Sequence, residues 1–192
     1  MKLLNAGCGT HYANGWVNTD TWDDGLTTRP DTRVEPGKPY PFPDDYFDAV
    51  FLGHVLEHIA WSDVPAFLHD MRRIAKNNAP FLVCGPDVLK TIRRWAAGQE
   101  PWEMVLSTME HQDMNTQPGR EHLWWDGAHH HWNCHHDRAA KLLAQCGFTD
   151  IVDVSDLIPK NPQMRGWENN GIHWPVVGHW HWHFAIHCVN SK

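Results

Sequence analysis

Two groups of residues have the types and positions needed to bind a ligand. The first is the glycine-rich segment Asn5-Ala6-Gly7-Cys8-Gly9, which follows the apolar start of the chain. Glycines in such a turn let the backbone approach a ligand closely at the carboxyl end of a sheet. The second is Asp20, which ends the next apolar run and whose carboxylate can accept hydrogen bonds from both hydroxyls of a ribose. The same aspartate could instead cap a turn.

The glycine segment does not match the dinucleotide-binding fingerprint. Tyr12 stands where the third glycine would be, and Asp20 comes only 11 residues after Gly9, whereas the fingerprint places its acid roughly 20 residues further on. The stretch between Gly9 and Val17 is also too short for the helix whose N-terminus would hold a pyrophosphate. We therefore predict a ligand other than a dinucleotide.

Histidines supply most of the other reactive side chains. The segment His54-Val55-Leu56-Glu57-His58 has the spacing of the inverted zinc proteases, but zinc needs both histidines on one helix, and here they span the boundary between an apolar run and a helix start. The cluster from His129 to His136 could bind a metal, although it repeats no known zinc spacing. A polar loop in which one histidine caps the following helix is favoured there, and we predict no metal ligand.

Apolar runs and helical periodicity define the elements that would position these groups. Strands are predicted at residues 1–6, 16–20, 32–35, 47–52, 80–85, 148–154 and 181–189, and helices start near 55 and cover 63–76, 88–97, 101–112 and 138–146. Several of the strands are continuously apolar, which indicates a sheet that is covered on both faces. The sequence therefore predicts a three-layer α/β fold.

Tryptophan and histidine are unusually frequent, at 12 and 16 residues, and they concentrate late in the chain. In the last predicted strand, histidines and tryptophans alternate, which predicts a half-buried strand with a polar histidine face. These residues are His179, His181, His183 and His187 on one face, and Trp180 and Trp182 on the other. We expect several tryptophans to be buried against the sheet, Trp180 and Trp182 among them, and others to line a pocket. Trp95, Trp102, Trp124, Trp125 and Trp132, within residues 88–133, are expected mainly to pack.

Length, charge and cysteine content exclude several protein classes. A chain of 192 residues is expected to form a single domain over residues 1–192. The net charge of −7 disfavours a broad nucleic-acid surface, and no apolar run approaches the ~18–20 residues of a membrane span. Five scattered cysteines and an N-terminus without a signal peptide are typical of reduced thiols in a cytoplasmic protein. The oligomeric state cannot be predicted.

The motifs, taken in order, resemble the class I S-adenosylmethionine-dependent methyltransferases, most closely the type 11 group and its short relatives. The matching segments are residues 3–9, 15–20, 40–50, 53–58, 71–76, 80–87 and 142–148. They cover most of residues 2–154 in the order of that family. The resemblance implies a Rossmann-like sheet, with the helix between the first two strands missing and residues 88–133 forming a lid on the acceptor side.

The resemblance also implies roles by position. The turn of Asn5, Ala6, Gly7, Cys8 and Gly9 would hold the methionine end of S-adenosylmethionine. Asp20 would bind the ribose hydroxyls, with Thr21 beside it in the cofactor site. Glu35 would lie beside the adenine, although an aspartate is commoner there. Gly53 and His54 would pass close to the methyl-bearing sulfur.

We therefore predict methyl transfer from S-adenosylmethionine to an oxygen or nitrogen of a small-molecule or glycan-type acceptor. A hydroxyl acceptor needs a base, and His54 is the best placed candidate. His111, His122 and His129, His130 and His131 are alternatives on the lid side. The motifs of DNA amino- and carbon-5-methylases are absent from the sequence. A catalytically inactive cofactor- or metal-binding protein on the same fold remains the alternative.

Overall fold

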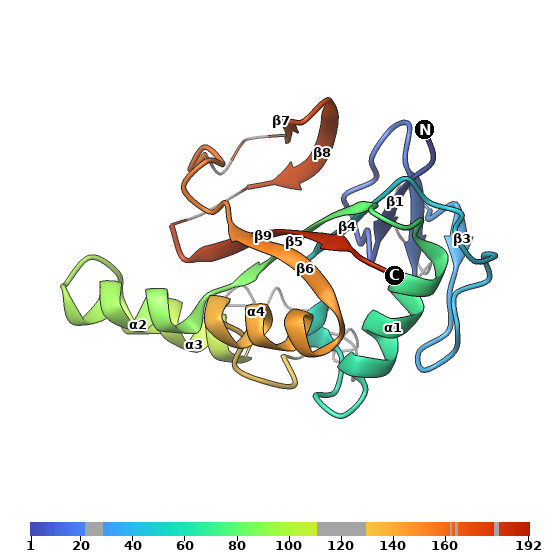
Figure 1. Cartoon of the computed structure of the whole chain (residues 1–192). Helices are drawn as coiled ribbons and strands as arrows, with labels where there is room; N and C mark the ends of the chain where they lie inside the picture. Colours follow the sequence, from blue (N-terminus) through green and yellow to red (C-terminus); the bar gives the residue numbers. More distant parts are fainter. Residues whose placement is uncertain (22–28, 111–129, 162, 164, 179–180) are drawn as a thin grey trace.

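A computed structural model describes residues 1–21, 29–110, 130–161, 163, 165–178 and 181–192, and it is built around a seven-stranded sheet (Figure 1). The strand order is β3-β2-β1-β4-β5-β9-β6, in which the first five are parallel and β9 is antiparallel to both neighbours. The strands are β1 (Leu3–Ala6), β2 (Val17–Asp20), β3 (Thr32–Arg33), β4 (Ala49–Gly53), β5 (Pro80–Pro86), β6 (Phe148–Asp153) and β9 (His183–Asn190). The order reverses direction between β1 and β4, where open α/β sheets bind their ligands.

One face of the sheet packs against two helices, α1 (Val64–Ile74) and α4 (His136–Gln145). Leu68 of α1 and Leu143 of α4 are fully buried in the same apolar cluster as Val50 of β4. The buried side chains of α1 recur at helical spacing, which is why the sequence pattern predicts this helix correctly.

The opposite face is covered by a β-hairpin instead of helices. Its strands, β7 (Arg165–Asn169) and β8 (Ile172–Val177), are joined by Asn170 and Gly171 with φ of 51° and 73°, the left-handed backbone of a tight hairpin turn. Trp174 is only 1% exposed and packs on Trp16, with 5.7 Å between ring centroids. The predicted three layers are therefore present, with a hairpin as the third. Residues 7–16, between β1 and β2, form turns and no helix, as expected.

Beyond the carboxyl end of β5 lie two further helices, α2 (Val88–Ala96) and α3 (Trp102–Glu110). Trp95 and Trp102 pack against each other at 5.0 Å, and Trp132 is buried. The packing interpretation is confirmed for Trp132, whereas Trp95 and Trp102 contact each other but are 43% and 45% exposed. Residues 111–129, which contain Trp124 and Trp125, lie outside the described part of the chain.

The predicted polar face of the last strand is wrong. β9 is inserted between β5 and β6 and is covered on both sides, so that His183 is 8% exposed. His187 is half-buried and packs edge-on against Trp174 at 6.5 Å. His181 precedes the strand and is exposed, and Trp182 is half-buried instead of buried. His179 and Trp180 lie outside the described residues.

Two predictions from composition can be compared with the structure. All five cysteines are buried and none forms a disulfide, as expected of reduced thiols. Among the described residues, no helix combines the length and apolar character that crossing a bilayer would require.

Asp87 links α2 and α4 through one carboxylate, because it accepts the Lys90 N–H at 3.0 Å and the His136 N–H at 3.4 Å. Asp87 is therefore the N-cap of α2. Replacing Asp87 with alanine should lower the free energy of unfolding by about 1–2 kcal/mol, measured by urea denaturation. Asparagine keeps a capping oxygen and should cost clearly less. Equal losses in the two variants would contradict the capping role.

Candidate functional site

A pocket of about 620 Å³ opens at the carboxyl ends of β1, β4 and β5. On one side it is lined by the glycine segment, by Gly53 at the end of β4, and by His54, the next residue. On the other side it is lined by α3, including Thr108, and by the end of the hairpin. Its volume lies in the range of small-molecule and cofactor sites. The pocket therefore lies at the carboxyl edge of the sheet, as predicted, and extends from the glycine turn to α3.

The glycine turn is held in a shape that requires glycine at position 7. Gly7 has a φ of +65°, and a Cβ atom there would lie 2.6 Å from Cγ2 of Val55. The buried amide of Asn5 donates hydrogen bonds to the His11 carbonyl at 3.0 Å and to Oδ1 of Asn18 at 2.9 Å. Side-chain hydrogen bonds thus fix the connection between β1 and β2, which contains no helix.

Asp20 meets the glycine turn directly. Its Oδ2 accepts the Gly9 N–H at 2.7 Å, so that the acid at the end of β2 and the turn after β1 form one continuous surface. Ala6 is fully buried, and only its backbone lies at this edge of the sheet. The geometry brings the predicted turn and the predicted acid together.

Five predicted cofactor residues do not line the pocket: Ala6, Gly9, Asp20, Thr21 and Glu35. Thr21 is half-buried at the end of β2, and its carbonyl accepts a hydrogen bond from Nε of Arg33 at 3.3 Å. Glu35 is exposed two residues beyond β3. Their contacts with a cofactor therefore stay predictions.

The two cysteine thiols that line the pocket, Cys8 and Cys84, are held in their protonated form. Burial, and next the negative charge of Asp20, raise the pKa of Cys8 to about 12. Burial and the charge of Glu57 raise the pKa of Cys84 as well. A protonated thiol is a weak nucleophile, so neither cysteine is suited to covalent catalysis.

His54 projects from a strained turn after β4. Its φ of +56° is uncommon for a residue with a side chain, and its N–H donates to the Cys84 carbonyl at 2.9 Å. Nδ1 lies 3.2 Å from Oε1 of Glu57, and the ring packs edge-on against His183 with 4.5 Å between centroids. The side chain is 39% exposed, in the wall of the pocket. A buried carboxylate thus orients an accessible imidazole.

Glu57 belongs to a short 3₁₀ helix, η1 (Leu56–His58), and its side chain is fully buried. Within the described residues, neither carboxylate oxygen has an aligned hydrogen-bond partner. Burial raises its pKa, but the contact with His54 and the positive charges of His54, His58 and His130 together outweigh burial and lower the pKa to about 2. Glu57 is therefore an ionised carboxylate beneath the pocket.

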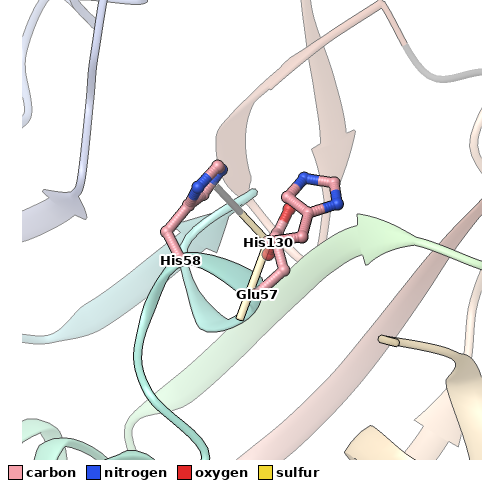
Figure 2. A group of neighbouring side chains, drawn as sticks. All are labelled: Glu57, His58 and His130. Carbon is pink, nitrogen blue, oxygen red and sulfur yellow. The ribbon is translucent and has the colours of Figure 1, made fainter. Parts of the chain in front are cut away.

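His58 and His130 approach this carboxylate from two different parts of the chain. Their ring centroids are 5.0 Å apart, and one nitrogen or oxygen atom of each of Glu57, His58 and His130 lies within 4.8 Å of the others. Figure 2 shows the three side chains grouped at η1. The H-x-x-E-H spacing contains Glu57 and His58, but no local signal connects them to His130, 72 residues after His58.

The other histidines of the late cluster have separate positions. His131 is exposed, and His135 caps α4 by accepting the Arg138 N–H at 3.4 Å, which confirms the predicted cap. His111, His122 and His129 lie outside the described residues. His11 and His183 also line the pocket, and the sequence predicts no function for either of them.

Comparison with known proteins agrees with this geometry. The family described as methyltransferase domain matches residues 4–83. A SAM-dependent methyltransferase from Archaeoglobus fulgidus is similar with a TM-score of 0.57 and 13% identity, covering 98% of this chain and 85% of that one. A 1,6-didemethyltoxoflavin-N1-methyltransferase from Burkholderia thailandensis, solved with 1,6-didemethyltoxoflavin and S-adenosylhomocysteine, has a TM-score of 0.53 and 12% identity, covering 100% and 71%. No curated protein matches the chain.

The sheet order and the pocket at its switch point define the class I methyltransferase fold. Together with the family match over residues 4–83, they make the chain similar to methyltransferases that use S-adenosylmethionine. The residues present fit this cofactor, because Gly7 leaves room at the pocket wall and the Asp20 carboxylate contacts the same turn at the Gly9 N–H.

Proposed function

We propose that the enzyme methylates an oxygen or nitrogen of a small-molecule or glycan-type acceptor, which enters the pocket from the side of α3. The observation that carries the proposal is the continuity of the pocket, since the same cavity is lined by Gly7 and by Thr108 of α3. Both reactants can then lie in one pocket, and positioning them together is the main requirement when the transferred group is already activated.

At the cofactor end, the Asn5–Gly9 turn would hold the methionine portion and Asp20 the ribose hydroxyls. S-adenosylmethionine supplies a methyl group activated by its sulfonium centre. Gly53 and His54 would lie next to the transferred methyl. The chain itself would contribute position and exclusion of water.

At the acceptor end, His54 would act as the base for a hydroxyl. Its imidazole is accessible from the pocket, and Glu57 lies 3.2 Å from Nδ1, where it would stabilise the imidazolium that forms. An amine with a free lone pair would need only positioning. Thr21 and Glu35 would complete the cofactor site near the ribose and the adenine.

Size, shape and charge support a small acceptor. Met104, Pro175 and Trp182 give the acceptor side an apolar component, and the net charge of −7 disfavours a nucleic-acid substrate. The similar Burkholderia thailandensis enzyme is named for N1-methylation of 1,6-didemethyltoxoflavin. We expect residues 88–133 to act as the acceptor-side lid.

The test is calorimetry of the purified protein with S-adenosylmethionine and S-adenosylhomocysteine. Binding of both should be followed by release of S-adenosylhomocysteine when a panel of hydroxyl and amine compounds is added. Absence of cofactor binding at millimolar concentration would contradict the proposal.

Replacing His54 with asparagine should lower kcat for a hydroxyl acceptor by about tenfold or more, because the base is lost. Asparagine tolerates the left-handed backbone at this position, so the fold should be retained. Affinity for S-adenosylmethionine, measured by calorimetry, should stay close to that of the wild type. Unchanged kcat with a hydroxyl acceptor would exclude His54 as the base.

A further inference from the structure

Glu57 is a carboxylate buried with few polar contacts. Its carboxylate is fully buried, neither oxygen has an aligned hydrogen bond among the described residues, and Oε1 lies 3.2 Å from Nδ1 of His54. Burying a charge without hydrogen bonds is costly unless another charge compensates it. The side chain is therefore suited to a cation at this place.

His130 is oriented as a metal ligand would be. Its Nδ1 lies 2.9 Å from the carbonyl oxygen of Thr108, and a carbonyl can only accept, so Nδ1 carries the proton. In the neutral ring this leaves the lone pair on Nε2, the form that binds metal ions. Hydrogen bonding of the second ring nitrogen to a carbonyl is typical of histidines at metal sites.

The segment that carries His130 is fixed onto η1 by its own hydrogen bonds. The His131 N–H donates to the Glu57 carbonyl at 2.8 Å, and Nε1–H of Trp132 donates to the Leu56 carbonyl at 2.9 Å. Trp132 is buried in the core. His130 is thus held beside Glu57 and His58 by contacts that involve none of the three side chains.

We propose that Glu57, His58 and His130 bind a divalent first-row transition metal ion, with zinc as the probe. Two imidazoles and a carboxylate form a common ligand set for zinc that leaves coordination positions open. The three donor atoms lie within 4.8 Å of one another, and ligands in a tetrahedral zinc site lie about 3.4 Å apart. Small side-chain rotations would close this difference.

The site lies on the acceptor side of the pocket, since His58 and His130 line it together with α3. Resting on the proposed function, the bound ion would take an acceptor that offers a hydroxyl oxygen as a ligand. Coordination lowers the pKa of such a hydroxyl. Its proton would pass to His54 as the oxygen–methyl bond forms and the sulfur–methyl bond of S-adenosylmethionine breaks, which leaves S-adenosylhomocysteine. The substrate class would then be small molecules that chelate through hydroxyl groups.

Zinc binding to untagged, metal-free protein tests the site directly. Calorimetry in competition with a chelator should give one tight zinc per chain, and cobalt should produce the visible spectrum of a protein-bound ion. His58→Ala, His130→Ala and Glu57→Gln should each weaken zinc binding by about 100-fold. His173→Ala is the matched control, because His173 also lies 2.9 Å from a glutamate, Glu168, but both side chains are exposed on the hairpin.

Circular dichroism of each metal-free variant separates loss of ligand from loss of fold, and Glu57→Gln preserves the shape of the buried side chain. Zinc binding that is absent in the wild type, or equal in the wild type, His58→Ala and His130→Ala, would overturn the metal site. Titration of metal-free wild type with S-adenosylmethionine tests the proposed function separately, because the two titrations use different residues.

Discussion

Replacing Asp20 with asparagine should weaken binding of S-adenosylmethionine by about 100-fold, which corresponds to roughly 2.7 kcal/mol. A carboxylate accepts hydrogen bonds from both ribose hydroxyls, whereas an amide offers one oxygen and would place a donor against the second hydroxyl. Hydrogen bonds to a charged group are each worth about 1.5–3 kcal/mol. The loss is measured by calorimetry.

The asparagine variant should fold normally, since its oxygen can still accept the Gly9 N–H that Asp20 accepts at 2.7 Å. Asp156→Asn is the control, because it removes the same charge from an exposed side chain that does not line the pocket. Affinity near the wild-type value in Asp20→Asn, with an unchanged circular dichroism spectrum, would refute the ribose contact.

The first half of the fold could be predicted because its signals are local. Continuous apolar runs such as residues 80–85 identify buried strands. In the structure, successive side chains of a buried strand point to opposite faces of the sheet, so that Val50 faces α1 and Phe51 faces the hairpin. The glycine turn and Asp20 each follow directly from such a strand. Their meeting is then fixed by the parallel pairing of β1 with β2.

The hairpin had a local signal that the prediction did not use. Asn170-Gly171 lies between two short runs, and this pair is the strongest short-range indication of a two-residue hairpin turn. The error at β9 has a different origin. Alternation of histidine and tryptophan predicts one polar face, but β9 is inserted between β5 and β6, and both of its faces are buried. The position of a strand within the sheet depends on the whole fold and is not visible in the strand's own sequence.

In the candidate site, too, some residues are grouped in the sequence and one is brought in only by tertiary contacts. His54, Glu57 and His58 lie within five residues, so their grouping is visible in the sequence. His130 joins them only because the segment after residue 129 returns to η1, where Leu56 and Glu57 accept its hydrogen bonds. Tertiary contacts of this kind leave no periodicity in the sequence, and the H-x-x-E-H spacing alone pairs His54 with His58 and gives no sign of His130.

The hairpin takes the place of missing helices, and Trp174 is its main contact with the sheet. Its ring is 1% exposed and packs on Trp16 at 5.7 Å. Trp174→Ala should lower the free energy of unfolding by about 3–5 kcal/mol, and the melting temperature by roughly 10 °C. Because Val176 of β8 lines the pocket, cofactor affinity should fall as well.

Two comparison variants show whether burial causes this loss. Trp174→Phe keeps an aromatic ring and removes a buried Nε1 that has no hydrogen-bond partner among the described residues, so it should cost only about 1 kcal/mol. Trp95→Ala removes a ring that is 43% exposed on α2, and less than about 1 kcal/mol is expected. Urea denaturation of the three variants ranks their losses of unfolding free energy. If Trp174→Ala were no more costly than Trp95→Ala, the hairpin would not be the layer that stabilises this face of the sheet.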